Sequence, residues 1–525
     1  MPLAALALLA SCSNDKLDGP EPGSNDSKVY GTFYINLPSS NGTRAVSGYE
    51  SGDYEEYAVT SGKILLFQKK ADDASATFVT SADLVNVESS EEGNDNWDNG
   101  STEITATTKQ ATAEFTGIDK NVDYVALVVL NPGSLRMPDP GQSFSDWNTH
   151  KTVTKAQAMN EEGFMMTNAP QFVATDKTPT TLVDIDENEL KEKAEDLKNA
   201  GTAGTFYVQR VVAKIEVKFV SGVDVNTKKF PVKGSDADFV DFSSSNWLVD
   251  VENTVAYPVQ NVSGFTSWIS TDNGNQSGRF YSSTNTKRIW WAEDPNYTSG
   301  SYYDNENPED PPFVNGIQRA NTNSDEYHPF VTGSAYCMEN TMEYNKMEQD
   351  KTTRLILHGV YNLGGHFGSF ITYGNLSLPV VNTDINEEVR NDGDKYKASE
   401  LFTEEKLAEL NRDYGIKEST EVTYYPGGHV YYVVRIRHFD DTETPLVGGV
   451  ASADEYQTKH RGRYGVLRNN LYEVVINSIE GPGAPNKNEV PKDPTPDDPK
   501  DSKYSMNVQI NILDWAKRSY GYDLK

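Results

Sequence analysis

The chain has 525 residues, more than one hydrophobic core usually organises, so two folded domains with extensions are expected. Its 78 acidic and 47 basic side chains give a formal net charge of -31, which repels phosphate backbones and excludes nucleic acid as an expected partner. The hydrophobic content of 36%, with 29 Tyr and 20 Phe, predicts a globular body.

The N-terminus has the pattern of a bacterial lipoprotein signal. A short apolar run begins at Pro2, ends in Leu9-Ala10-Ser11-Cys12 and is followed by polar residues. Residues 1–12 are therefore predicted to be a signal segment in which Cys12 receives lipid. The alternative is that Cys12 is a thiol in a disordered N-terminus. Cys337, the other cysteine, is predicted to be a small buried hydrophobic residue.

The first predicted strand covers residues 28–37 and alternates in polarity. Its apolar face carries Val29, Phe33, Ile35 and Leu37 together with Gly31, and polar or tyrosine side chains take the opposite face. A Pro/Ser/Asn/Gly turn at residues 38–42 ends it.

Further short strands bounded by turn residues predict an all-β chain with two β-sandwich domains. The N-terminal domain is placed at residues 45–209 and the C-terminal domain at residues 210–480. Two windows, 188–200 and 403–412, are predicted to be short surface helices, the second capped by Thr403. The predicted strands are at residues 63–67, 113–115, 124–130, 206–219, 246–249, 354–361, 430–437 and 471–479.

Residues 264–329 have little strand pattern but are rich in Ser, Asn, Gly and aromatic residues, including Trp268, Trp290 and Trp291. A loop of this kind can form a carbohydrate-binding face. The alternative is that the aromatic side chains pack the loop onto its own domain, which is the more common arrangement.

A Pro- and Asp-rich linker, residues 481–503, precedes the last predicted strand, which lies within residues 504–525. That strand alternates strictly, with Met506, Val508, Ile510 and Ile512 on its apolar face. Taken alone, this segment favours a last strand that folds back onto its own domain.

No catalytic motif is recognisable, and no cofactor or metal site is expected. The nucleophile elbow, the Walker loop, His-Glu-x-x-His and Cys-x-x-Cys are all missing from the sequence, and its seven histidines show no metal-ligand spacing. The chain is therefore predicted not to be an enzyme.

Three segments together resemble the Bacteroidia-type fimbrillins, also called type V pilins. These are the lipoprotein signal ending at Cys12, the strand followed by Gly42-Thr43-Arg44-Ala45, and the run Arg463 to Ile476 with its Arg468-Asn469-Asn470 motif. Within the family, the chain looks most like the short-fimbria (Mfa-type) major subunit. The resemblance implies two transthyretin-like β-sandwich domains with a C-terminal donor strand, lipid-dependent export, and removal of the first strand by an arginine-specific protease.

The resemblance also implies a function. Residues 13–44 would be a propeptide that carries the removable strand, cut between Arg44 and Ala45, and the C-terminal strand would fill the vacated place in a neighbouring subunit. The product would be a shaft subunit of a surface pilus that supports adhesion, first an outer-membrane lipoprotein and then part of an extracellular fimbrium. Expected partners are identical subunits, anchor and tip pilins, the protease, and a host or bacterial surface receptor. The alternative function is a non-polymerising surface lipoprotein that binds glycan through residues 264–329.

Overall fold

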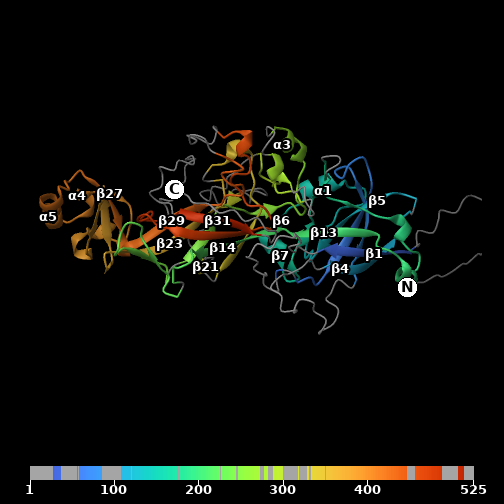
Figure 1. Ribbon diagram of the computed structural model, residues 1–525, viewed down its shortest axis with the longest axis horizontal. Coiled ribbons are helices and arrows are strands. Elements are labelled where there is room, and N and C mark those ends of the chain that lie inside the picture. The colour runs from blue at the N-terminus through green and yellow to red at the C-terminus, as the bar shows by residue number, and fades with distance from the viewer. Residues whose placement is uncertain are drawn as a thin grey trace, which may run out of the picture.

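Figure 1 shows an elongated molecule with three parts along its longest axis. A β-domain with the N-terminal strands lies at one end, a second β-domain lies in the middle, and a small module of helices and strands lies at the other end. This computed structural model describes residues 28–36, 56, 58–85, 108–119, 121–173, 178–224, 226–243, 246–271, 277–281, 288–298, 317–318, 328–329, 333–348, 351–445, 456–486 and 507–513.

The N-terminal domain is built on one sheet that curls back on itself. The strand order is β3-β2-β5-β9-β13-β1-β4, and β12 pairs with β5. Val85, just beyond β3, exchanges two backbone hydrogen bonds with Thr112 of β4, at 2.8 and 3.0 Å, so the two edges of the sheet meet. The strands are β1 Lys28–Asn36, β2 Gly62–Gln68, β3 Thr77–Asp83, β4 Thr108–Thr116, β5 Tyr124–Leu130, β9 Met166–Asn168, β12 Val183–Asp184 and β13 Gly204–Arg210.

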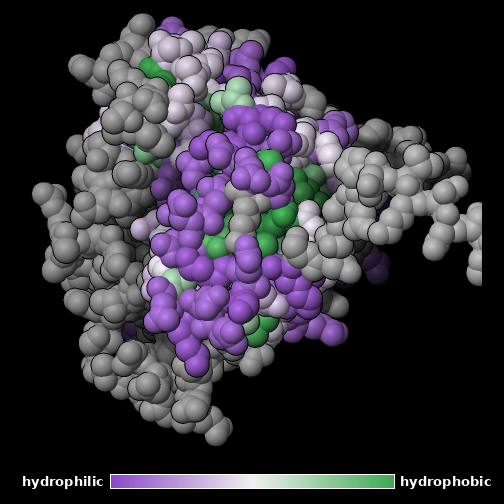
Figure 2. Space-filling model, turned by 90° about the vertical axis from the view of Figure 1, so that its right-hand side faces the viewer, coloured by the Kyte–Doolittle hydropathy of each residue, from purple (hydrophilic) through white to green (hydrophobic). Residues whose placement is uncertain are grey.

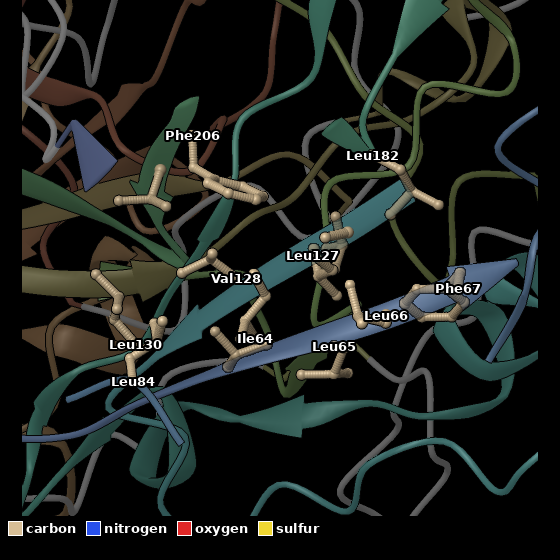
Figure 3. Close-up of a cluster of buried hydrophobic side chains, with 14 of the residues drawn as sticks. Ile64, Leu65, Leu66, Phe67, Leu84, Leu127, Val128, Leu130, Leu182 and Phe206 are labelled. Carbon is tan, nitrogen blue, oxygen red and sulfur yellow. The ribbon is translucent and has the colours of Figure 1, made fainter. Parts of the chain in front are cut away.

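Continuous apolar runs supply the core of this domain. Every residue of β5 is buried, and side chains of β2, β5 and β13 meet in one cluster (Figure 3). Helix α1, Phe144–His150, packs on these strands, with the ring of Phe144 5.8 Å from that of Phe67 and Trp147 fully buried. A strand covered on both faces has no polar face, which explains why residues 124–130 read as an unbroken apolar run.

The C-terminal domain is a sandwich of two sheets around a second core. One sheet has the order β22-β14-β30-β31, and the other has the order β15-β16-β23-β17-β21, with β24 and β29 also paired to β23. The strands are β14 Val212–Phe219, β15 Lys229–Pro231, β16 Phe239–Asp241, β17 Asn246–Asp250, β21 His328–Pro329, β22 Ser334–Met338, β23 Arg354–Leu363, β24 His366–Phe367, β29 His429–Arg435, β30 Leu471–Ser478 and β31 Asn507–Leu513.

Short ribbons and turns connect these elements. The two-stranded ribbons pair β10 with β11, β18 with β20, β19 with β6 and β7 with β8. Their bounds are β6 Val153–Thr154, β7 Met159–Asn160, β8 Gly163–Phe164, β10 Gln171–Val173, β11 Thr178–Thr180, β18 Glu252–Asn253, β19 Val255–Ala256 and β20 Ile317–Gln318, and the helices are α2 Lys155–Ala158 and α3 Phe265–Thr271. In the described part of the chain, no helix has the length and apolar character needed to span a membrane.

The all-β fold is confirmed, and each predicted strand has a counterpart in the structure. One prediction needs correcting, because residues 206–219 form two strands rather than one. β13 ends at Arg210 in the N-terminal sheet and β14 begins at Val212 in the C-terminal sandwich, so Val211 alone separates the strands of the two domains. The predicted boundary at residues 209 and 210 lies next to this connection.

The helix predicted at residues 188–200 is present only in part, because no continuous α-helix forms there. The segment holds two short 3-10 turns, Glu187–Glu189 and Ala194–Asn199. Between them, Lys191 forms a β-bridge with Tyr30 of β1, which requires extended backbone in the middle of the window. Tertiary pairing therefore overrides the helix-forming composition.

A separate small module interrupts the C-terminal domain between β24 and β29. Its sheet has the order β26-β25-β28-β27, and its helices pack on a core of their own that includes Ile371, Leu410 and Tyr424. The second predicted helix is confirmed here as α5, with Thr403 accepting a hydrogen bond from the amide of Lys406 at 3.4 Å. The elements are β25 Phe370–Tyr373, β26 Leu376–Pro379, β27 Lys395–Lys397, α4 Ala398–Leu401, α5 Glu404–Tyr414 and β28 Glu421–Tyr425.

Because the module has its own core, Leu410→Ala should destabilise it without loosening the two large domains. We expect a local loss of about 2–4 kcal/mol, seen by hydrogen exchange as faster amides in β25, β28 and α5 with β5 and β14 unchanged. Leu376→Ala, at a side chain that is 40% exposed, is the matched control and should cost less than about 1 kcal/mol. Equal loosening of β5 would show that the module is not independent.

Candidate assembly site and domain junction

The predicted removable strand, β1, lies inside the N-terminal sheet rather than at an edge. It pairs antiparallel with β4 along its whole length and parallel with β13 over residues 33–36. Of its predicted core residues, Val29, Phe33 and Ile35 are buried, and the ring of Phe33 lies about 6 Å from those of Phe115 and Phe206. Leu37 lies outside the described residues, as do the predicted lipidation site Cys12 and the predicted cleavage site Arg44-Ala45.

Residues 186–203, here called the strap, cover the part of β1 that β13 does not reach. Tyr30 and Lys191 exchange two backbone hydrogen bonds of 2.7 and 2.8 Å, and the amide of Ala203 donates to the carbonyl of Thr32 at 2.8 Å. Thr32 is consequently buried, although the alternating pattern places it on the outer face. Sequence reasoning missed the strap because its contacts with β1 span more than 150 residues of chain.

The predicted donor strand, β31, pairs antiparallel with β30 of its own domain. It occupies the edge of the four-stranded sheet, with Val508, Ile510 and Ile512 at register positions opposite Ile476, Val474 and Tyr472. Met506 lies outside the described residues. In the single chain, the last strand therefore folds back, as the isolated segment favours.

The motif Arg468-Asn469-Asn470 lies at the junction of the two domains. Arg468 is fully buried, and its guanidinium donates to the Glu339 carboxylate at 3.0 and 3.2 Å. It also donates to the backbone carbonyls of Tyr257 and Pro258, at 2.9 and 3.2 Å. Glu339 is fully buried too, so the pair depends on these added hydrogen bonds to offset its desolvation.

The two asparagines of the motif hold the chain where it passes between domains. Asn469 adopts a left-handed backbone conformation with φ 57°, accepts from the Arg210 amide at 3.2 Å, and donates its own amide to the Val212 carbonyl at 2.7 Å. Asn470 accepts from the Lys214 amide at 2.9 Å. The motif thus contacts the end of β13 and the start of β14 together.

Glu56 connects the segment after the predicted cleavage site to the same junction. Its carboxylate accepts from Lys214 at 2.7 Å and from the hydroxyl of Tyr336, and its carbonyl accepts from Arg210. Burial lowers the pKa of Arg210 to about 10. Burial by itself would lower the pKa of Lys214. The carboxylates of Glu56 and Glu216 have a larger effect, so the pKa of the Lys214 ammonium is raised. Both cations therefore stay charged at neutral pH.

The three tryptophans of the proposed glycan loop are buried. Trp268, Trp290 and Trp291 are at most 7% exposed and belong to an aromatic cluster that includes Phe172 and Phe439. The described part of residues 264–329 therefore packs its aromatic side chains inward, as the alternative interpretation expects. Within the described residues, no group of three or more His, Cys, Asp or Glu could hold a metal ion.

Arg468→Met should cost about 3–5 kcal/mol of unfolding free energy, because it leaves the Glu339 carboxylate buried without its cation. Adding Glu339→Leu should recover most of the loss, since the uncompensated charge is then gone. Urea unfolding of the full chain measures both variants. Arg136→Met is the control, because its pair with Asp139 is about 70% exposed and should contribute less than about 1 kcal/mol. If Arg468→Met loses no more unfolding free energy than Arg136→Met, the buried Arg468–Glu339 ion pair does not stabilise the fold.

Comparison with known proteins finds a family likeness for the C-terminal part of the chain. The family model described as major fimbrial subunit protein type IV, fimbrillin, C-terminal, matches residues 423–521, which include β29, the Arg468-Asn469-Asn470 motif, β30 and β31. No curated protein sequence matches the chain significantly. One similar solved structure is a proposed cell adhesion protein from Parabacteroides distasonis, with 10% identity over 93% of this chain and 98% of that chain and a TM-score of 0.35. Residues 423–521 of this chain are therefore similar to the C-terminal region of fimbrillins.

Proposed function

We propose that this chain is a shaft subunit of a surface pilus, exported as a lipoprotein on Cys12, cut after Arg44, and polymerised by donor-strand exchange. Its partners are identical subunits, anchor and tip pilins and an arginine-specific protease. The assembled fibre binds a host or bacterial receptor. The supporting observation is the contrast between β1, paired on both edges, and β31, paired on one.

Removal of β1 creates a binding groove for another strand. The departure of this strand exposes the backbone edges of β4 and β13 and uncovers the space filled by Val29, Phe33 and Ile35. Unpaired strand edges and an apolar trough attract a strand of matching pattern. Refilling three such side-chain positions contributes roughly 5–9 kcal/mol before ordering costs.

The C-terminal strand gains pairing when it moves. Among the described residues, β31 pairs with β30 along one edge, whereas in the place of β1 it would meet β4 on one side and β13 with the strap on the other. Exchange therefore replaces one ladder of backbone hydrogen bonds with two. The Pro- and Asp-rich linker at residues 481–503 gives the strand an extended tether with which to reach a neighbour.

Proteolysis controls the timing. While β1 is covalently joined to its domain, it competes for the groove at an effective concentration that no neighbouring strand can match. A cut after Arg44 removes this advantage, and Glu56 keeps the new N-terminal segment attached to the domain junction. The alternative glycan-binding function has no such support, because the tryptophans that suggested it are buried.

Arg44→Ala should leave a folded precursor that is not cut at this position and does not polymerise. N-terminal sequencing of surface material should find Ala45 as the first residue of the normal subunit. Gels of unboiled surface material should show high-mass ladders for the normal chain and only monomer for the variant. Arg136→Ala, at an exposed arginine of the same domain, is the control and should leave both results unchanged. Fibres built from uncut Arg44→Ala subunits would overturn the cleavage step.

Deletion of residues 504–525 should give cut, folded monomers without fibres. In the full chain, cysteines at Gln110 on β4 and Gln509 on β31 should be joined between chains by a short thiol-reactive cross-linker. Val475 is the register partner of Gln509 on β30, so Val475→Cys with Gln509→Cys reports the folded-back strand. Cys337 does not interfere because it is fully buried and burial raises the pKa of its thiol. Fibres that cross-link only through the Val475 pair would contradict strand exchange.

A further inference from the structure

The buried face of β1 has one position without a side chain. Gly31 lies between Val29 and Phe33 on that face, and its partner on β4 is Ala113, which is also small and buried. A Cβ atom on Gly31 would lie 2.6 Å from Cζ of Phe33 and 3.0 Å from Cδ2 of Leu190. The phenyl ring of Phe33 therefore fills two positions of the face, with Leu190 closing the space from the side.

Leu190 belongs to the strap and is its inward-pointing anchor. It is 3% exposed and packs in the domain core, whereas the residues from 191 to 200 are partly or largely exposed. The strap is also attached to the domain independently of β1, since the amide of Tyr124 on β5 donates to the Glu187 carboxylate at 3.1 Å. Within the strap, the Glu189 carboxylate accepts from the Gly201 amide at 2.6 Å. Leu190 therefore stays in the groove when β1 leaves.

The C-terminal strand has a different pattern from β1. Its apolar positions Val508, Ile510 and Ile512 all carry branched side chains, and no glycine interrupts them. When β1 departs, the ring of Phe33 leaves with it and frees the volume above the position of Gly31. Two branched aliphatic groups at neighbouring inward positions can fill a space that β1 fills with one glycine and one phenylalanine.

We propose that Leu190 and Ala113 form a subsite of the acceptor groove that receives a branched aliphatic side chain from the C-terminal strand of a second copy of this chain. The inference rests on the proposed function and adds a specificity determinant to it. The incoming side chain takes the place of Gly31, contacts Leu190, and excludes a phenylalanine at the next inward position. The two strands therefore fill the same groove with different side chains. β1 uses a glycine and a phenylalanine, and the donor strand uses two branched aliphatic residues.

This difference in packing can be tested without polymerisation, in the uncut full chain that carries Arg44→Ala. Gly31→Val should lower the melting temperature because the new side chain meets the Phe33 ring, and Phe33→Val should lower it by leaving a void. The double variant reproduces the donor pattern. It should melt at least about 4 °C above the value expected from adding the two losses. Additive losses would overturn the subsite.

The partner is tested with a labelled peptide of residues 504–525, in excess over the full chain cut after Arg44. The peptide variants Val508→Gly, Ile510→Gly and Ile512→Gly are each bound to the normal chain and to the Leu190→Ala chain. For one of the three, the fold-loss of affinity with the normal chain should exceed the fold-loss with the Leu190→Ala chain by at least about tenfold. Leu190→Trp should weaken binding of the normal peptide by a similar factor, and Leu197→Trp, elsewhere on the strap, should not. Leu190→Met should bind normally, which guards against a folding defect.

Equal losses in the normal and Leu190→Ala chains for all three peptides would refute the role of Leu190. A cut chain that binds no peptide would instead refute strand exchange, and with it the donor as the occupant of the subsite. The melting experiment separates the two cases, because it reports the packing in the groove whether or not exchange occurs.

Discussion

The backbone of β1 must be hydrogen-bonded along both edges, and the rest of the N-terminal domain is arranged around that requirement. β4 satisfies one edge completely. β13 satisfies only half of the other, and the strap supplies the remaining partners at Tyr30 and Thr32. A buried backbone group without a partner costs about 1–3 kcal/mol, so neither the strap nor β13 is dispensable to a strand in this place. Whatever occupies the groove must meet the same donors and acceptors.

The second organising feature is the buried polar junction between the domains. Arg468, Asn469 and Asn470 contact both sides of the connection at Val211, and Glu56 adds a contact from the N-terminal side. Charges this deeply buried are maintained only by complete hydrogen bonding, which fixes their geometry. The two large domains are therefore joined through specific bonds rather than through a flexible linker.

The sequence was most informative where the signal was local. Alternation in residues 28–36 identified the strand and its buried side chains, and the cap at Thr403 located α5. Non-local contacts decided the remaining features. Nothing near Lys191 signals its bridge to Tyr30, and nothing near Arg468 points to Glu339, which is 129 residues away. The interruption by the small module was missed because the sequence predicted only its helix at residues 403–412 and none of the four strands that pair in its sheet.

The one-residue connection at Val211 has a mechanical consequence. β13 and β14 run almost continuously through both domains, with the parallel partners β1 and β30 beside them. A pull along this axis loads each ladder in shear, so its hydrogen bonds resist together instead of opening one after another. Under such a pull, the two β-domains would therefore hold their length.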